Sequence, residues 1–302
     1  MRAFAILLAG LGASFGAAVC GQEVAGDPPP QETVLAAGRD REQRMTIPVT
    51  IAGKGPFRFM VDTGAQATVV AREILPQLGL VPDGRATLVG VGSISEVETV
   101  ALDGLGFAGR EFGGLTAPLL DGDHIGADGI IGLDSLEGLR VTIDLRADTL
   151  AVSDAGGRQG ANGYEIVVRA RARRGQMVIT TAVFDGVRTA VIIDTGSQVS
   201  IGNRALQRRL RARTRTHHLS RDILGTLVES DLGYAQKLEI GPLSLRDIPI
   251  AFAESPAFEA LGLARTPAVI LGMGNLELFD RVAIDFASRR ILFDLPADVA
   301  AR

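Results

Sequence analysis

Two copies of the tripeptide Asp-Thr-Gly contain the residues of this chain with the clearest chemical potential. They begin at Asp62 and Asp194, 132 positions apart in a chain of 302 residues. Two carboxylates about 3 Å apart cannot both ionise comfortably, so they share one proton and titrate as a pair. One of them can then deprotonate water while the other protonates or polarises the group that the water attacks. A single tripeptide would be compatible with a surface turn, so the surroundings of both copies matter.

The residues around each aspartate suit a rigid and poorly hydrated carboxylate site. Gly64 and Gly196 permit a sharp backbone turn that brings N–H groups close to the carboxylates. Val61 precedes the first aspartate and Ile192-Ile193 precede the second, and β-branched residues of this kind are typical of strands. We therefore expect both loops to be held by rigid strands in an apolar environment, where low water access strengthens the coupling of the carboxylates.

The sequence around the first aspartate is repeated around the second. Residues 57–70 read FRFMVDTGAQATVV, and residues 187–202 read VRTAVIIDTGSQVSIG. Each segment follows or contains an apolar run beside a glycine-containing turn, a pattern that predicts a β-hairpin. Further along, residues 128–133 (DGIIGL) and 268–273 (AVILGM) each precede another pair of apolar runs. The chain therefore consists of two similar units in tandem.

With two complete copies of these motifs, the chain resembles the retropepsin-like aspartic peptidases, in particular the exported bacterial proteins with two such domains. The resemblance covers residues 45–153 and 163–296. It implies an all-β fold of two acid-protease β-barrel lobes that form a pepsin-like pseudo-dimer, with short helices. It also implies an endopeptidase in which Asp62 and Asp194 meet as the catalytic pair and activate water. The expected substrate is a polypeptide, and no cofactor is expected.

The same resemblance assigns supporting roles to residues near the pair. The hydroxyls of Thr63 and Thr195 would bond across the interface between the lobes and lock the two loops together. The segments 130–132 (Ile-Ile-Gly) and 270–272 (Ile-Leu-Gly) would brace the loops from behind. The predicted dyad-supporting residues are Thr63, Gly64, Thr195, Gly196 and Ser197.

The two loops differ in the residue that follows the tripeptide. Ala65 stands in the first copy and Ser197 in the second. A serine hydroxyl that donates to Asp194 would favour the charged form of that carboxyl. We therefore hypothesise that Asp194 is the more acidic member of the pair and that Asp62 more often carries the shared proton. The alternative is that Ser197 only satisfies its own loop.

A hairpin that covers the substrate is expected between Asp62 and residues 130–132. Residues 88–93 read LVGVGS, and glycine-hinged lids often close over a substrate and exclude water. The alternative is an ordinary hairpin turn. No tyrosine, the flap residue of pepsin-like enzymes, occurs near residues 88–95, and the matching region 221–233 contains less glycine. The predicted flap and substrate-binding residues are Gly90, Val91, Gly92 and Ser93.

The N-terminus differs in character from the rest of the chain. Arg2 is followed by an uncharged apolar run up to Cys20, which predicts a signal peptide over residues 1–20 and a secreted or periplasmic protein. The alternative is an uncleaved membrane anchor, which would be the only membrane contact. Cys20 is the only cysteine, so an internal disulfide and a cysteine-based metal site are excluded. Residues 21–44 contain three consecutive prolines and are predicted to form a flexible tether.

Charge and histidine content exclude other classes of function. The net charge of −4 argues against a general nucleic-acid-binding protein, which needs a basic excess. His124, His217 and His218 have no spacing typical of a zinc site, and we predict no metal site. Residues 121–128 contain three aspartates, but their spacing does not match an EF-hand loop. We interpret that segment as a polar turn.

Further segments have structural interpretations. Residues 203–215 contain six arginines and are predicted to form a short helix capped by Asn203, with a solvated basic face. Residues 72–80 follow Asp62 at about the distance at which residues 203–215 follow Asp194, and they are predicted to form the equivalent short helix in the first unit. Asp144 and Asp285 occupy equivalent places in the final hairpins of the two units, where we expect them to stabilise turns or strand ends.

Two alternatives concern assembly and activity. One chain could supply both aspartates as a monomer with pseudo-two-fold lobes, or each unit could pair with its twin in a homodimer. The comparable length and completeness of the two units favour the monomer. The rival function is a non-catalytic peptide-binding or regulatory module that keeps the fold. Such relatives usually lose one aspartate or the Thr-Gly that follows it, and both copies are intact here.

Overall fold

The computed structural model describes residues 32–40, 43–154, 164, 166–173, 176–210 and 216–296. The predicted signal peptide, Cys20 and the first part of the predicted tether lie outside these residues. No helix in the described part of the chain combines the length and apolar character needed to span a membrane.

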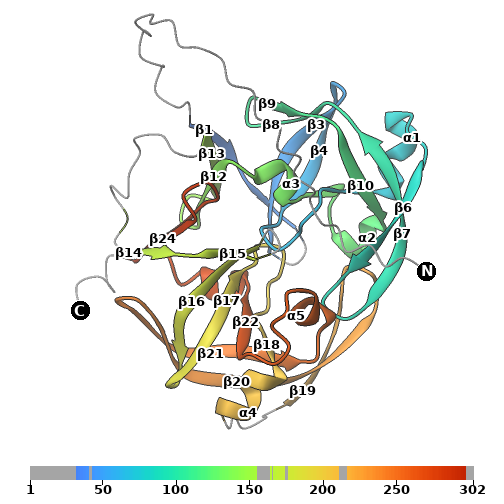
Figure 1. Ribbon diagram of the computed structural model, residues 1–302. Helices are drawn as coiled ribbons and strands as arrows, with labels where there is room; N and C mark the ends of the chain where they lie inside the picture. Colours follow the sequence, from blue (N-terminus) through green and yellow to red (C-terminus); the bar gives the residue numbers. More distant parts are fainter. Residues whose placement is uncertain are drawn as a thin grey trace, which may run out of the picture.

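The described residues form an all-β protein with short helices, and Figure 1 shows two lobes that follow each other along the sequence. The N-terminal lobe contains β1 (Thr33–Ala36), β2 (Gly38–Arg39), β3 (Met45–Ile51), β4 (Lys54–Val61), β5 (Val69–Ala71), the 3₁₀ helix η1 (Arg72–Ile74), α1 (Leu75–Leu78), β6 (Gly84–Val89), β7 (Ile94–Leu102), β8 (Leu105–Phe107), β9 (Arg110–Phe112), β10 (Leu115–Leu120), α2 (Gly122–Ile125), β11 (Gly129–Ile131), α3 (Leu133–Leu136), β12 (Leu139–Asp144) and β13 (Thr149–Asp154).

The C-terminal lobe has the same general plan of strands and short helices. It contains β14 (Ile166–Arg169), β15 (Arg171–Arg173), β16 (Gln176–Phe184), β17 (Val187–Ile193), β18 (Ile201–Asn203), α4 (Arg204–Leu210), β19 (Thr216–Arg221), β20 (Leu227–Ile240), β21 (Leu243–Ala253), α5 (Pro256–Ala260), β22 (Ala268–Leu271), α6 (Met273–Leu276), β23 (Arg281–Asp285) and β24 (Arg290–Asp294). The predicted fold class, two barrel-like β lobes with short helices, is confirmed.

Each lobe is built on its own curved sheet. In the N-terminal lobe the strand order is β6-β7-β10-β5-β11-β4-β3-β8-β9, with β2 paired to β3. In the C-terminal lobe the order is β15-β16-β17-β22-β18-β21-β20-β19, and an extra pairing between β16 and β20 closes part of the sheet. Strand β3 alternates between buried and exposed residues from Ile47 to Ile51, as expected for a strand with one face on a core.

A third sheet joins the two lobes. Its strand order is β1-β13-β12-β23-β24-β14, so it combines the final hairpin of each unit. The central contact is antiparallel pairing of β12 with β23, in which Arg140 lies opposite Asp285 and Ile143 opposite Val282. The main hydrophobic cluster continues from one lobe to the other through buried residues such as Val141 and Ile284. The lobes therefore share a core, which fixes the position of one Asp-Thr-Gly loop relative to the other.

The prediction of a flexible tether over residues 21–44 is wrong for its described part. Strand β1 pairs antiparallel with β13, with Thr33 opposite Val152, and β2 pairs with β3. The Arg39 guanidinium forms ion pairs with Asp148 at 2.7 Å and with Glu277 at 3.1 Å. Strands of two and four residues give too short a pattern to recognise in sequence, because their stability comes from a partner strand. For β1 that partner lies more than a hundred residues away, and for β2 it is the nearby β3.

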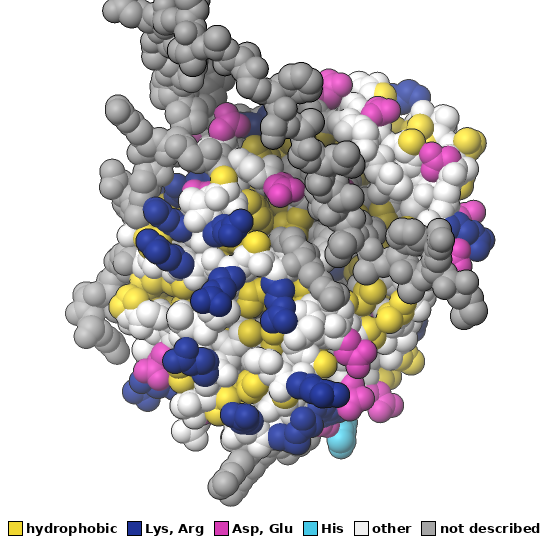
Figure 2. All heavy atoms as spheres, viewed as in Figure 1, with side chains coloured by type: hydrophobic (Ala, Val, Ile, Leu, Met, Phe, Trp, Pro, Cys, Tyr) yellow, Lys and Arg dark blue, Asp and Glu magenta, His cyan; other side chains and the backbone are white. Residues whose placement is uncertain are grey.

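The prediction of a short helix after Asn203 is confirmed for Arg204–Leu210, while residues 211–215 of the predicted segment lie outside the described residues; the predictions for residues 72–80 and for the turn aspartates are confirmed. Helix α4 begins after Asn203, whose Oδ1 accepts a hydrogen bond from Leu206 N at 2.9 Å. Its residues Arg208 and Arg209 are exposed, and Figure 2 shows basic side chains spread over this face of the C-terminal lobe. Residues 72–78 form η1 and α1. In the two final hairpins, Asp144 and Asp285 accept hydrogen bonds from turn N–H groups.

Candidate active site

The two Asp-Thr-Gly loops come together at the junction of the lobes. Asp62 directly follows β4 and Asp194 directly follows β17, and each is only 9% exposed. Their backbone N–H groups donate to Ile131 O at 3.1 Å and Leu271 O at 3.0 Å, respectively. The two carboxyl groups are close enough to hydrogen-bond to each other. One chain thus brings both aspartates into a single buried site.

The threonine hydroxyls cross the interface between the lobes. Thr63 Oγ1 donates to Ile193 O at 2.9 Å, and Thr195 Oγ1 donates to Val61 O at 2.7 Å. Each hydroxyl also accepts the backbone N–H of the other threonine, at 3.1 and 3.3 Å. Both threonines are buried, so these four hydrogen bonds hold the two loops together without competition from water.

Glycine is required where each loop passes under the opposite carboxylate. A Cβ atom added to Gly64 would lie 2.7 Å from Asp194 Oδ1, and one added to Gly196 would overlap the carboxylate of Asp62. No side chain fits at either place unless the carboxylates separate. The third residue of each tripeptide therefore sets the spacing between the two acids, in addition to shaping the turn.

The two carboxyls have unequal pKa values. Burial raises the pKa of Asp194 well above its ordinary value of 3.8, and the charge of Asp62 raises it further, while Gly196 N–H lowers it. Burial also raises the pKa of Asp62, but less, because hydrogen bonds from Asp194 and from the N–H groups of Gly64 and Ala65 lower it. The larger number of N–H donors at Asp62 favours the ionised form of Asp62 over that of Asp194.

The hypothesis that Ser197 makes Asp194 the more acidic member is wrong. The Ser197 hydroxyl donates to Val199 O at 2.8 Å, within its own loop. The asymmetry comes from the backbone instead, since Asp62 Oδ1 accepts from both Gly64 and Ala65 whereas one N–H, that of Gly196, bonds Asp194. The residue types could not indicate this difference, because it depends on the orientation of main-chain N–H groups.

The segments 130–132 and 270–272 lie behind the two loops, where the resemblance placed them. Strand β11 runs parallel to β4, and β22 runs parallel to β17. Gly132 N donates to Thr68 Oγ1 at 3.2 Å, and Gly272 N donates to Ser200 Oγ at 2.9 Å. Sequence reasoning missed Thr68 and Ser200, although their equal distance from the two aspartates was a usable signal.

Residues 88–93 form the tip of a hairpin made by β6 and β7, and this hairpin meets a second one from the other lobe. The second hairpin is made by β19 and β20, with Asp222 at its tip. Asp222 Oδ2 accepts hydrogen bonds from Gly92 N at 3.1 Å and Ser93 Oγ at 3.0 Å. Leu224, beside Asp222, packs on an apolar cluster that Ala65 of the catalytic loop also touches. The paired tips and that loop therefore pack on one apolar cluster.

The other polar groups singled out in the sequence do not join this site. Asp121 caps the one-turn helix α2 by accepting from Asp123 N at 2.9 Å. His217 and His218 are exposed on β19, and His217 Nδ1 lies 3.0 Å from Asp231. The described residues contain no group of three or more His, Cys, Asp or Glu side chains arranged to hold a metal ion.

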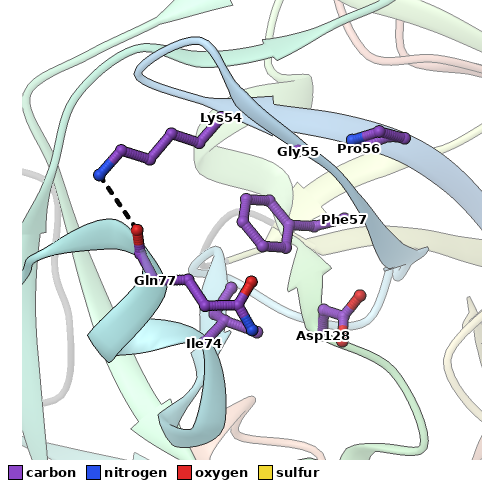
Figure 3. A pocket seen from close by; sticks show the side chains of 7 residues that line it. All are labelled: Lys54, Gly55, Pro56, Phe57, Ile74, Gln77 and Asp128. Atoms are coloured by element: carbon purple, nitrogen blue, oxygen red, sulfur yellow. Dashed lines mark hydrogen bonds between the residues drawn. The ribbon is translucent and has the colours of Figure 1, made fainter.

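A separate pocket of about 410 Å³ lies on the N-terminal lobe between the start of β4 and helix α1. Figure 3 shows Lys54 at its edge with the ammonium directed at Gln77 O, at 3.0 Å. Asp128, at the opposite side, accepts from Arg58 N at 2.7 Å. Its charged groups are thus engaged in holding the fold, and the pocket offers no acid–base pair.

Two buried residues next to the dyad were missed entirely in the sequence. Arg44 Nη1 donates to Gly196 O at 3.3 Å, and Gln176 Nε2 donates to Gly64 O at 2.6 Å. The signal that could have revealed them is their position, because each stands eighteen residues before the aspartate of its own unit.

Comparison with known proteins agrees with this geometry. A family model described as "Aspartyl protease" matches the chain twice, at residues 47–135 and 180–274. Each matched segment includes one Asp-Thr-Gly loop and the apolar-apolar-Gly segment behind it. No curated protein matches the chain. With a repeated match over most of both lobes, and a shared pair of aspartates between them, the chain belongs to the aspartyl protease family.

Proposed function

We propose that this protein is an exported aspartic endopeptidase in which Asp62 and Asp194 activate a water molecule. The observation that carries the proposal is the buried, hydrogen-bonded carboxyl pair, with Asp62 favoured as the ionised member and Asp194 as the protonated one. A base and an acid side by side are what hydrolysis of an amide requires without a metal or covalent nucleophile.

The proton transfers follow from this arrangement. Asp62 accepts a proton from water as the water oxygen attacks the peptide carbonyl, and Asp194 donates its proton to the carbonyl oxygen. The resulting tetrahedral diol collapses when Asp62 returns its proton to the departing nitrogen and Asp194 regains a proton from one hydroxyl. The products are a carboxylic acid and an amine, and both aspartates return to their starting states.

The substrate is proposed to be an extended polypeptide that lies between the dyad and the hairpin tips. Leu88 and Leu224 of the two tips pack on the same apolar cluster as Ala65, which follows the first Asp-Thr-Gly, so a peptide held between them would be shielded from water. Gly90, Val91, Gly92 and Ser93 are proposed to contact it. Main-chain hydrogen bonds to an extended peptide would give affinity with little dependence on sequence.

The active form is proposed to be a monomer, because the hydrogen bonds of Thr63 and Thr195 join the lobes within one chain. Export is proposed on the apolar segment before Cys20. Cell fractionation together with the N-terminal sequence of the mature protein tests export: an unprocessed chain in the cytoplasm contradicts it. Light scattering on an active sample tests the assembly, and activity confined to dimers contradicts a monomeric site.

The activity is tested by incubating the purified protein with a denatured protein and with a peptide library over a range of pH. Asp62→Asn and Asp194→Asn are expected to lower the rate by about 10³-fold or more. Asp148→Asn, a surface change 54% exposed at the side chain, is the matched control and should keep full activity. Peptide binding without cleavage by the wild type would instead support a non-catalytic module, and full activity of either dyad variant would overturn the mechanism.

A further inference from the structure

Arg44 and Gln176 occupy equivalent positions in the two lobes. Each immediately precedes a buried methionine, Met45 at the start of β3 and Met177 near the start of β16. Both side chains belong to residues that are 3% exposed. Their shared spacing from the two aspartates means that the pseudo-two-fold repeat relates one to the other.

The two side chains make equivalent contacts across the interface. Arg44, in the N-terminal lobe, donates to the carbonyl of Gly196 in the C-terminal catalytic loop. Gln176, in the C-terminal lobe, donates to the carbonyl of Gly64 in the N-terminal loop. Each of these glycines lies under the carboxylate of the other lobe. The pair therefore holds the two residues that set the spacing of the dyad, and it adds to the hydrogen bonds of the threonines.

The two positions differ in charge. The Arg44 guanidinium lies 2.6 Å from Asp40 Oδ2, and Asp40 Oδ1 accepts the backbone N–H of Arg44 at 2.8 Å. The same nitrogen, Arg44 Nη2, also donates to Ile125 O. In the other lobe, the position equivalent to Asp40 is the exposed Ala172, and Gln176 Oε1 has no hydrogen-bond partner among the described residues. Among the described residues, a buried cation therefore stands on one side of the dyad only.

We propose that Arg44 and Gln176 are positioning residues that brace the catalytic glycines from the opposite lobe, and that the one-sided charge of Arg44 keeps the dyad singly ionised. The second part rests on the proposed function. A guanidinium stays protonated at every pH at which the protein is folded, so its field on the carboxyls is permanent.

The charge of Arg44 and the burial of the site shift the pKa values of Asp62 and Asp194 in opposite directions. The charge of Arg44 lowers the pKa of both carboxyls, whereas desolvation raises both. Asp40 partly offsets the cation through its ion pair. The ring of His124, on α2, packs against Gly225 in the second hairpin tip. Arg44 therefore adds to the hydrogen bonds from Gly64, Ala65 and Gly196, which also oppose burial and favour the loss of one proton from the pair.

The test compares pH–rate profiles of single variants. In Arg44→Gln both lobes have the same amide, and both limbs of the profile are expected to move to higher pH. Gln176→Ala removes a brace without changing charge, so kcat is expected to fall about tenfold with both limbs unmoved. Arg85→Gln, at a side chain 68% exposed, is the control for loss of an arginine. Limbs that stay in place in Arg44→Gln would overturn the charge role.

Arg44→Gln leaves Asp40 buried beside an uncharged group, which can prevent folding. The double change Asp40→Asn with Arg44→Gln removes both charges and is expected to shift the limbs in the same direction. Full kcat in Gln176→Ala would overturn the bracing role.

A readout that needs no catalysis separates this proposal from the proposed function. Carbon-13 NMR can follow the titration of the Asp62 and Asp194 carboxyls in the full chain. Higher titration midpoints in the double variant than in the wild type support the role of Arg44, even if the wild type cleaves no peptide. Equal midpoints overturn it, even if the wild type is an active peptidase.

Discussion

The Ser93 hydroxyl of the N-terminal lobe donates to the Asp222 carboxylate of the C-terminal lobe at 3.0 Å. Thr226 Oγ1 completes the contact with a hydrogen bond to Ser93 Oγ at 3.0 Å. Each lobe thus contributes one hairpin tip to a single closed arrangement. A peptide bound as proposed, between the dyad and the tips, would require these bonds to open.

Ser93→Ala is expected to loosen the hairpin tips. The change removes the hydroxyl's bonds to Asp222 and Thr226 but keeps the bond from Gly92 N. Loss of about 1 kcal/mol of closing free energy predicts roughly fivefold faster amide exchange at the tips. Hydrogen–deuterium exchange measures the exchange rate of these amides. Ser95→Ala is the matched control, since no hydrogen bond of the Ser95 side chain occurs within the described residues, and equal exchange in both variants contradicts the role of Ser93.

Thr63→Val is expected to destabilise the junction of the lobes, whereas Thr63→Ser is expected to cost much less. Valine has the same shape but leaves Ile193 O and Thr195 N–H buried without their bonds to the hydroxyl. Each such group costs about 1–3 kcal/mol. Urea unfolding gives the free energies. Similar stability of the two variants would mean that packing of the methyl group, and not the hydroxyl, holds the loops together.

Asp194→Asn is expected to raise stability at neutral pH. The pKa of Asp194 is raised in the folded protein above 3.8, so its contribution is fully present below about pH 3.8 and is lost as pH rises through the folded pKa. Asparagine stays neutral and avoids this loss. Thermal unfolding should therefore show a variant more stable than the wild type at pH 7, with a difference that vanishes near pH 3. The surface variant Asp148→Asn should show no such trend; a destabilised Asp194→Asn at pH 7 contradicts the prediction.

Asp40→Ala is expected to destabilise the protein by about 3–5 kcal/mol, because it leaves the buried Arg44 guanidinium without its carboxylate. The comparison is Glu96→Ala, which breaks an ion pair with Arg85 whose side chains are 61% and 68% exposed. That change is expected to cost less than about 1 kcal/mol because water screens exposed charges. Chemical unfolding of both variants measures the two changes in the free energy of unfolding. Equal changes would show that the buried ion pair of Asp40 stabilises the protein no more than an exposed one.

Much of the architecture could be predicted because local sequence patterns indicate it, and these patterns occur in both units. The runs of β-branched residues beside Asp62 and Asp194 indicated strands, and glycine at positions 64 and 196 indicated tight turns. The hairpin over residues 88–93 followed from the same kind of local signal. Strands β1 and β2 did not, because their short sequences gain stability only from pairing with β13 and β3.

The sequence by itself determined the two catalytic candidates, the tandem lobes and the family, since these depend on residue type and spacing. The tertiary structure decided which aspartate has the better environment for a negative charge, because that follows from the number and direction of N–H groups at Asp62 and Asp194. It also decided that Arg44 and Gln176 reach across to the opposite glycines. Long-range contacts of this kind form only when two distant segments are packed together, and no local pattern of residues specifies them.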